Sequence, residues 1–162
     1  MALEVCKILN LDKNETEKIH IAAHLHDIGK IGVPDAVLQK QGKLTENEWQ
    51  QMKKHPEYGA NILKKSHRLS ELSEIVLMHH ERFDGKGYPF GKSGNEIPLG
   101  ARIIAICDSI DAMTSNRCYR KSLSFETCYN EIKINLGKMY DPQIGQKVLD
   151  NWSQIIGVLA QA

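Results

Sequence analysis

The chain has 162 residues, which is enough for one domain, residues 1–162, with a real hydrophobic core. Its formal net charge is +1, which excludes a global attraction to DNA or to an anionic membrane, so any anion must be bound by a local cluster. No apolar run is long enough to span a bilayer, no signal peptide is recognisable, and the four cysteines show no metal-type pairing or disulfide-rich density. These features predict a cytoplasmic protein in a reducing compartment.

The first two predicted helices lead to an adjacent histidine and aspartate. Residues 3–9 carry an apolar stripe and start without a capping residue, so we expect the domain to be incomplete at this end. Residues 12–14 break this helix and begin the next one, which places His26 on its apolar face. Asp27 follows at the C-terminal end, where the helix dipole disfavours a carboxylate, and Gly29 is a stop signal.

Two interpretations of this His26–Asp27 pair are open at this point. A metal cation would compensate both the unfavourable dipole and the cost of burying a carboxylate, and both residue types are good metal ligands. Alternatively, the histidine is a hydrogen-bonded core residue and the aspartate a helix cap, which is the commoner situation for an isolated pair. The rest of the chain favours the first interpretation.

The middle of the chain contains a second histidine beside a helix break. Residues 31–35 are punctuated by Pro and Gly and are expected to form a loop. Thr45 then opens a capping box, and the helix that follows is predicted to run to His55, where Pro56 ends or kinks it. A further helix is expected over residues 58–65.

Two more histidines precede a long loop. The next helix is predicted to end at residues 79–82, with His79 and His80 adjacent. Neighbouring residues on a helix point about 100° apart, so both can reach one site only near the helix end. Residues 83–98 are rich in Gly and Pro, and a loop of this length is usually functional or disordered. Its aromatic residues argue against disorder.

The C-terminal part of the chain adds one more buried carboxylate. Residues 101–113 form a strongly apolar segment, so Asp108 within that helix needs a charged or hydrogen-bonding partner. Residues 117–121 are a compact basic segment. Ser124 caps another helix, and residues 141–142, Asp-Pro, open a last one. No strand alternation or internal repeat is visible, so the fold is predicted to be all-α.

Histidines and carboxylates at helix ends or on apolar faces come from four separate segments: His26, Asp27, His55, His79, His80 and Asp108. They are too many for a tetrahedral structural zinc, and they suit two or more octahedral-type ions, such as iron or manganese, sharing a carboxylate. Such ions bind a phosphoryl oxygen and generate hydroxide at neutral pH. Lys30, one turn beyond the first pair, could neutralise charge on a phosphate.

Two motifs in the chain resemble those of the HD-GYP phosphodiesterases, a branch of the HD metal-dependent phosphohydrolases. They are HDIGKIGVPD at residues 26–35 and HHERFDGKGYP at residues 79–89. The resemblance spans nearly the whole chain. It departs from the family pattern at two points: an upstream ligand histidine usual in the family would precede residue 1, and Cys118 stands where proline is usual.

The resemblance implies an HD-domain helical bundle with a long GYP loop that hydrolyses cyclic di-GMP to pGpG, GMP or both through a metal-activated hydroxide. It implies that the six residues named above bind two or three divalent ions, iron or manganese, and that Asp27 bridges them. Catalytic roles fall to Lys30 and Asp27. The positions that match substrate-contacting ones are Lys30, Arg117, Arg120, Gly87 and Tyr88.

The resemblance also implies partners for this domain. An upstream sensor or receiver domain and diguanylate cyclase-type domains are typical of the family, and a homodimer is compatible with it. Two other functions are open on the sequence alone. One is a catalytically weak module that binds a cyclic dinucleotide or a protein, and the other is the same chemistry on another cyclic dinucleotide or on ppGpp.

Overall fold

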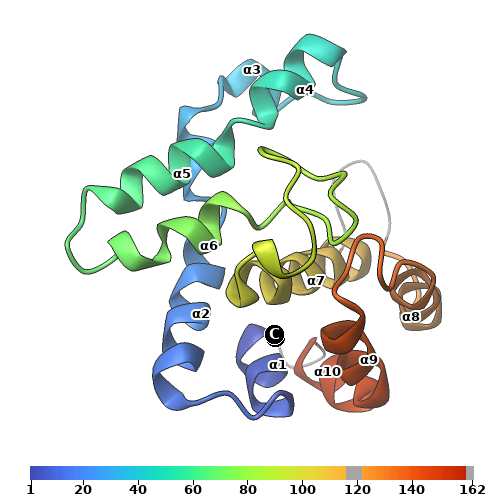
Figure 1. Ribbon diagram of the computed structural model, residues 1–162. Coiled ribbons are helices and arrows are strands. Elements are labelled where there is room, and N and C mark those ends of the chain that lie inside the picture. The colour runs from blue at the N-terminus through green and yellow to red at the C-terminus, as the bar shows by residue number, and fades with distance from the viewer. Residues whose placement is uncertain (116–121, 160–162) are drawn as a thin grey trace.

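The computed structural model describes residues 1–115 and 122–159, and within these ranges it is all-helical, which confirms the predicted fold class (Figure 1). Three short 3₁₀ helices and two isolated bridges complete the regular structure of the described residues. The elements in chain order are α1 (Ala2–Ile8), α2 (Lys13–Leu25), η1 (Ile28–Gly32), α3 (Asp35–Leu38), α4 (Glu46–Met52), α5 (His55–Lys64), η2 (Ser70–Leu72), α6 (Ser73–Leu77), η3 (Gly94–Glu96), α7 (Leu99–Thr114), α8 (Phe125–Ile134), α9 (Pro142–Asp150) and α10 (Trp152–Leu159).

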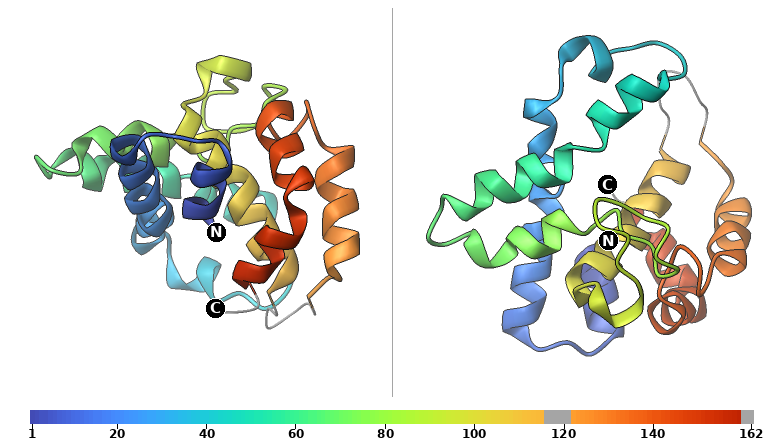
Figure 2. Two further views of the ribbon diagram at one scale, coloured as in Figure 1. Left: turned by 90° about the horizontal axis from the view of Figure 1, so that it is seen from below. Right: turned by 45° about the horizontal axis from the view of Figure 1, so that its top comes forward.

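Helix α7 lies at the centre of the molecule and joins two groups of helices (Figures 1 and 2). On one side it packs with α1, α8 and α9, and on the other with α2 and α6. Helices α3 and α4 pack on each other at one end of the molecule (Figure 1). The long predicted loop, residues 83–98, connects α6 to α7 and contains η3. This arrangement brings segments that are distant in sequence to the two faces of α7.

The core has two parts, and both α2 and α7 contribute to each of them. Ile19 and Ile106 lie in the part that α1, α8, α9 and α10 also line, whereas Ala22 and Ile104 lie in the part shared with α5 and α6. All four side chains are almost completely buried. Helices α2 and α7 are therefore held firmly against each other, and burial of this kind stabilises a domain in proportion to the apolar area removed from water.

Helices begin at the predicted caps Thr45, Ser124 and Asp141, and α2 begins after Asp12, within the predicted break at residues 12–14. Asp12, Thr45, Ser124 and Asp141 each accept a hydrogen bond from a backbone N–H in the first turn of the helix that they precede. The glutamate three residues after Thr45 completes the predicted capping box. The cysteines within the described residues, Cys6, Cys107 and Cys128, are buried free thiols, and no described helix has both the length and the apolar character needed to cross a membrane.

Two predicted helix ends near the histidines are wrong. Helix α4 ends at Met52, and His55 begins α5 instead of ending α4. Pro56 accounts for this, because its fixed φ and missing N–H suit the first turn of a helix. Helix α6 ends at Leu77, so His79 and His80 lie in the turn after it. The constraint of helical spacing on the two rings is thereby removed.

Two other boundaries also differ from the prediction. Residues 31–35 are not a plain loop, because η1 continues to Gly32 and α3 begins at Asp35. The last predicted helix is divided into α9 and α10 at Asn151. The Asn151 amide donates to the Lys147 carbonyl oxygen at 2.8 Å, a side-chain bond that competes with continuation of the helix.

Candidate metal centre

Four potential metal ligands from three segments meet at one point in the described structure. Ligand atoms of Asp27, His55, His79 and His80 all lie within 4.8 Å of one another. Asp27 comes from the junction of α2 and η1, His55 from the first residue of α5, and the two other histidines from the turn after α6. His55 and His79 are only 2% and 1% exposed, so their imidazoles cannot hydrogen-bond to solvent and need partners inside the protein.

The other two predicted ligands border this cluster. The His26 Nε2 atom lies 3.4 Å from Asp27 Oδ2 and 3.8 Å from Asp108 Oδ1. The second Asp27 oxygen, Oδ1, lies 3.3 Å from His55 Nε2. The Asp27 carboxylate thus stands between two imidazoles, with one oxygen turned to each. The structure therefore brings all six predicted residues into one neighbourhood, and its geometry is suited to a carboxylate bridge between cations.

Backbone carbonyls orient three of the imidazoles. The Nδ1 atom of each ring faces the carbonyl oxygen three residues earlier: His26 to Ala23 at 2.8 Å, His55 to Met52 at 2.8 Å, and His79 to Val76 at 2.6 Å. These contacts assign the ring proton to Nδ1, so each Nε2 directs a lone pair toward the cluster. The His55 and His79 Nε2 atoms are 3.4 Å apart. A shared cation would satisfy two lone pairs at this distance, which fits a metal site.

The protonation states that burial favours are those a metal needs. Burial lowers the pKa of His55 and of His79 and lowers that of His80 to about 3, and neighbouring imidazoles add to the effect. Burial alone would raise the pKa of Asp27, but the hydrogen bond from Lys30 and the nearby cationic groups outweigh it, so this pKa lies below its usual range. At neutral pH the cluster combines uncharged imidazoles with an ionised carboxylate.

Lys30 lies at the edge of the cluster and is held by Asp27. Its Nζ atom is 2.6 Å from Asp27 Oδ2, and its side chain is 43% exposed. The ammonium group therefore faces both the carboxylate and solvent. This position is compatible with a contact to an anion that enters the site, as the sequence predicts.

Close backbone packing fixes the separation between Asp27 and His55. A Cβ atom on Gly29 would come closer than 3.0 Å to the His55 carbonyl carbon and oxygen and to the Gly59 backbone nitrogen. A side chain cannot be accommodated there, because all three obstacles are backbone atoms. The glycine that the sequence marks as a helix stop is thus also what lets η1 lie against α5.

The loop of residues 83–98, called the GYP loop after its residues 87–89, returns to the cluster and places an aromatic ring on it. The Tyr88 N–H donates to the His80 carbonyl oxygen at 3.2 Å, and the two rings stack with centroids 4.9 Å apart and 28° between their planes. Burial raises the pKa of the Tyr88 phenol, so the group stays protonated at neutral pH. Gly87 permits this return, because a Cβ atom there would lie 2.6 Å from the His80 carbonyl oxygen and overlap backbone atoms of residues 81 and 82.

We expect Gly87→Ala to displace residues 87 and 88 from the backbone of residues 80–82. Turnover at this site should fall by about tenfold or more, since small displacements of positioned groups are costly. The matched control is Lys86→Ala, because Lys86 is the adjacent residue and its side chain is exposed. Rates of both variants on the same substrate check the expectation. Equal activity of G87A and wild type would contradict the close packing of Gly87 on the backbone of residues 80–82.

Two residues near the cluster were missed by sequence reasoning. Glu81 is 3% exposed; its Oε1 atom accepts the Phe90 N–H at 2.7 Å, while Oε2 has no hydrogen-bond partner among the residues that the structure describes. Trp49 on α4 meets Tyr88 edge-to-face, with ring centroids 6.2 Å apart. The position of Glu81 inside the HHE string was a signal for the first, whereas the contact of Trp49 depends on the tertiary structure. The predicted substrate contacts Arg117 and Arg120 lie outside the described residues.

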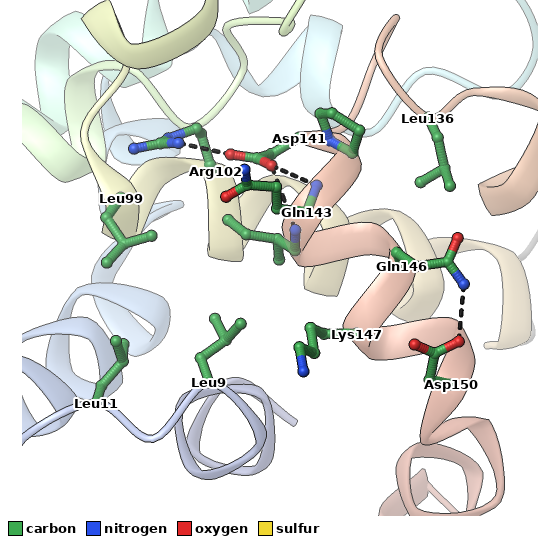
Figure 3. Close-up of a pocket in the computed structure, with 12 residues that line it drawn as sticks. Leu9, Leu11, Leu99, Arg102, Leu136, Asp141, Gln143, Gln146, Lys147 and Asp150 are labelled. Carbon is green, nitrogen blue, oxygen red and sulfur yellow. Dashed lines mark hydrogen bonds and ion pairs between the residues drawn. The ribbon is translucent and has the colours of Figure 1, made fainter.

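Two hollows of the described structure differ in whether they border the predicted ligands. One, of about 400 Å³, borders His26 and Asp108 and extends past His20 and His24 to Asp111. Another, of about 690 Å³, lies between the end of α1, α7 and α9 and touches none of the six predicted ligands (Figure 3). In it Arg102 and Asp141 pair with each other, and the leucines shown in Figure 3 form its apolar wall. Of these two hollows, only the first borders predicted ligands.

Comparisons with known proteins identify relatives of this chain. A family model described as an HD domain matches residues 1–144. Cyclic di-GMP phosphodiesterase response regulator RpfG of Xanthomonas campestris is 40% identical over 159 residues, which are 97% of this chain and 42% of that protein. 3'3'-cGAMP-specific phosphodiesterase 2 of Vibrio cholerae is 37% identical over 155 residues, 94% of this chain and 30% of that protein. The chain thus spans less than half the length of either relative.

A solved structure shares the fold. Bd1817, a HDG"Y"P protein from Bdellovibrio bacteriovorus, superposes with a TM-score of 0.71 at 20% sequence identity. The match covers 93% of this chain and 49% of that one. At this identity the likeness concerns the fold, and it extends over almost all helices described above.

Proposed function

This chain belongs to the HD domain family, and from that premise we propose that it is a metal-dependent phosphodiesterase that hydrolyses a cyclic dinucleotide. The observation that carries the proposal is that the Nε2 atoms of His55 and His79 lie 3.4 Å apart. Both Nδ1 atoms face backbone carbonyl oxygens, and the Asp27 carboxylate lies beside His55 Nε2. A cation held by both Nε2 atoms would satisfy both lone pairs, and burial lowers the pKa of both rings, which favours the uncharged form that binds a metal.

The proposed cofactors are two or three divalent ions, iron or manganese. The donor set supports this choice, because imidazole and carboxylate ligands without thiolate suit first-row ions of intermediate hardness. His26, Asp27, His55, His79, His80 and Asp108 would hold the ions, with Asp27 shared between them. When bound, the ions would supply Lewis-acid activation of the phosphodiester and of the attacking water.

The chain's own residues would orient the phosphodiester and handle its charge. Lys30 would exchange its contact with Asp27 for a phosphate oxygen and so offset negative charge in the transition state. The Tyr88 phenol, protonated at neutral pH, can donate a hydrogen bond to a second oxygen. Hydrolysis adds water across one P–O3′ bond, so the 3′ oxygen leaves as a hydroxyl group and the new end carries a 5′ phosphate.

Cyclic di-GMP is the proposed substrate, with pGpG, GMP or both as products. It is supported by the GYP loop and by RpfG, whose description names cyclic di-GMP. The Vibrio cholerae relative, described as specific for 3'3'-cGAMP, makes that nucleotide the principal competitor. The predicted phosphate contacts of Arg117 and Arg120 stay predictions from the sequence.

The predicted partners are part of the same proposal. RpfG is described as a response regulator, and both relatives extend well beyond the region matched here, which supports a neighbouring sensor or receiver domain. Diguanylate cyclase-type partners, a homodimer and a cytoplasmic location stay predictions from the sequence.

The test is turnover by metal-loaded protein. We expect protein reconstituted anaerobically with Fe(II) or Mn(II) to convert cyclic di-GMP to pGpG or GMP, measured by chromatography, with 3'3'-cGAMP run in parallel. Removal of metal with EDTA should abolish the reaction, and added Fe(II) or Mn(II) should restore it. Cyclic di-GMP that binds calorimetrically to metal-loaded protein without being cleaved would refute the enzyme and support a binding module.

A further inference from the structure

A row of aromatic rings leads from the metal cluster to the protein surface. His80, a member of the cluster, stacks on Tyr88, and Tyr88 in turn meets Trp49 edge-to-face at 77°. In a perpendicular pair one ring offers its edge to the other's face, so whichever ring supplies the edge, at least one indole face is not covered by Tyr88. The Trp49 residue is 42% exposed, which agrees with an accessible face.

From this placement we propose that Trp49 stacks a purine base of the substrate while the phosphodiester lies at the metal cluster. The inference rests on the proposed function and adds a base-binding position on α4 to it. Two ring contacts, with centroid separations of 4.9 and 6.2 Å, connect Trp49 to the cluster. Together they limit the distance between the Trp49 and His80 rings to about 11 Å. The base and the phosphate of one nucleotide are joined through a single ribose, so one nucleotide can reach both Trp49 and the cluster. Stacking on an indole holds any purine, because every base has a π-face.

The exposed surroundings of Trp49 favour a ligand over internal packing. Helix α4 has no buried residue, so its indole is not an anchor for a core. Trp152, by contrast, is half-buried, packs on Tyr129 and lies against the part of the core that α1, α8, α9 and α10 line. These two are the only tryptophans in the sequence, which provides both a probe and an internal reference.

Kinetics separate base stacking from the chemistry of the cluster. We expect Trp49→Ala to raise KM for cyclic di-GMP by roughly 5- to 100-fold at nearly constant kcat. Trp49→Phe should restore KM to within about threefold of wild type. With bis(p-nitrophenyl) phosphate, a phosphodiester without a purine, both variants should match wild type. The matched control is Phe125→Ala, an aromatic residue of similar exposure, 41%, on α8, which should leave both substrates unaffected.

Fluorescence gives a second readout that does not need turnover. In a Trp152→Phe background, whose remaining tryptophan is Trp49, titration with GMP should quench the emission, whereas ribose 5-phosphate, which lacks a base, should not. An unchanged KM for cyclic di-GMP in W49A, or loss of metal or of bis(p-nitrophenyl) phosphate cleavage in W49A, would overturn the stacking role. Failure of the metal-loaded wild type to cleave either substrate would instead refute the phosphodiesterase activity itself.

Discussion

Asp27→Ala is expected to remove bound iron or manganese and to lower hydrolysis of cyclic di-GMP by roughly 10²- to 10⁴-fold. The reason is the position of its carboxylate, with one oxygen 3.3 Å from His55 Nε2 and the other 3.4 Å from His26 Nε2. Alanine would leave these two imidazoles without the carboxylate that lies between them. Elemental analysis of the purified variant, alongside the turnover assay, measures both losses.

The control for this variant is Asp150→Ala. Asp150 is an exposed residue of α9, and its carboxylate accepts a hydrogen bond from the Gln146 side chain. Metal content and rate should stay at the wild-type level. Because the Asp27 side chain is 36% exposed, D27A should also fold, which circular dichroism can verify. A folded D27A protein with normal metal content would disprove the bridging role.

Gly29→Ala is expected to destabilise the domain by about 3 kcal/mol or more and to lower its metal content. The new methyl group would overlap backbone atoms of His55 and Gly59, so η1 and the start of α5 must separate. That movement carries Asp27 away from His55. For a domain of this size the loss corresponds to a melting temperature lower by about 6–12 °C.

Gly157→Ala is the same substitution, but it should raise the free energy of unfolding instead of lowering it. Gly157 lies within α10, and a Cβ atom there would meet nothing within 4 Å. Alanine should therefore stabilise the protein by about 0.5–1 kcal/mol, because it has less backbone entropy to lose on folding. Urea unfolding of G29A and G157A gives both free energies of unfolding. Equal stability of G29A and wild type would contradict the close packing of η1 on α5.

The family and the fold class followed from local features of the chain. Caps at Asp12, Thr45, Ser124 and Asp141 set helix starts because they act on the first turn alone. The two strings around His26 and His79 predicted a member of the HD-GYP group, and the HD-domain match over residues 1–144 together with the relatives named above confirms that assignment. The errors occurred at helix ends, where a turn competes with one more residue of helix at little difference in free energy.

The six candidate ligands were recognised from the sequence because each is a polar group at an apolar helix face or a helix end. Helical periodicity could show that polar residues occupy apolar positions. It could not show that His55 and His79, 24 residues apart, direct their Nε2 atoms at each other. That direction depends on the carbonyls of Met52 and Val76, which become available only because α4 and α6 end where they do.

The sequence by itself determined the all-helical class, the starts of several helices and the family, and it predicted the chemical nature of the site, since these depend on neighbouring residues and on spacing along one helix. The tertiary structure alone decided which atoms meet: the Asp27 oxygens between two imidazoles, Tyr88 over His80, and Trp49 against Tyr88. The contact of Asp27 with His55 joins residues 28 apart in the chain, and that of Trp49 with Tyr88 joins residues 39 apart. They arise from the packing of α2, α5 and α6 and from the return of the loop of residues 83–98, which no local pattern encodes.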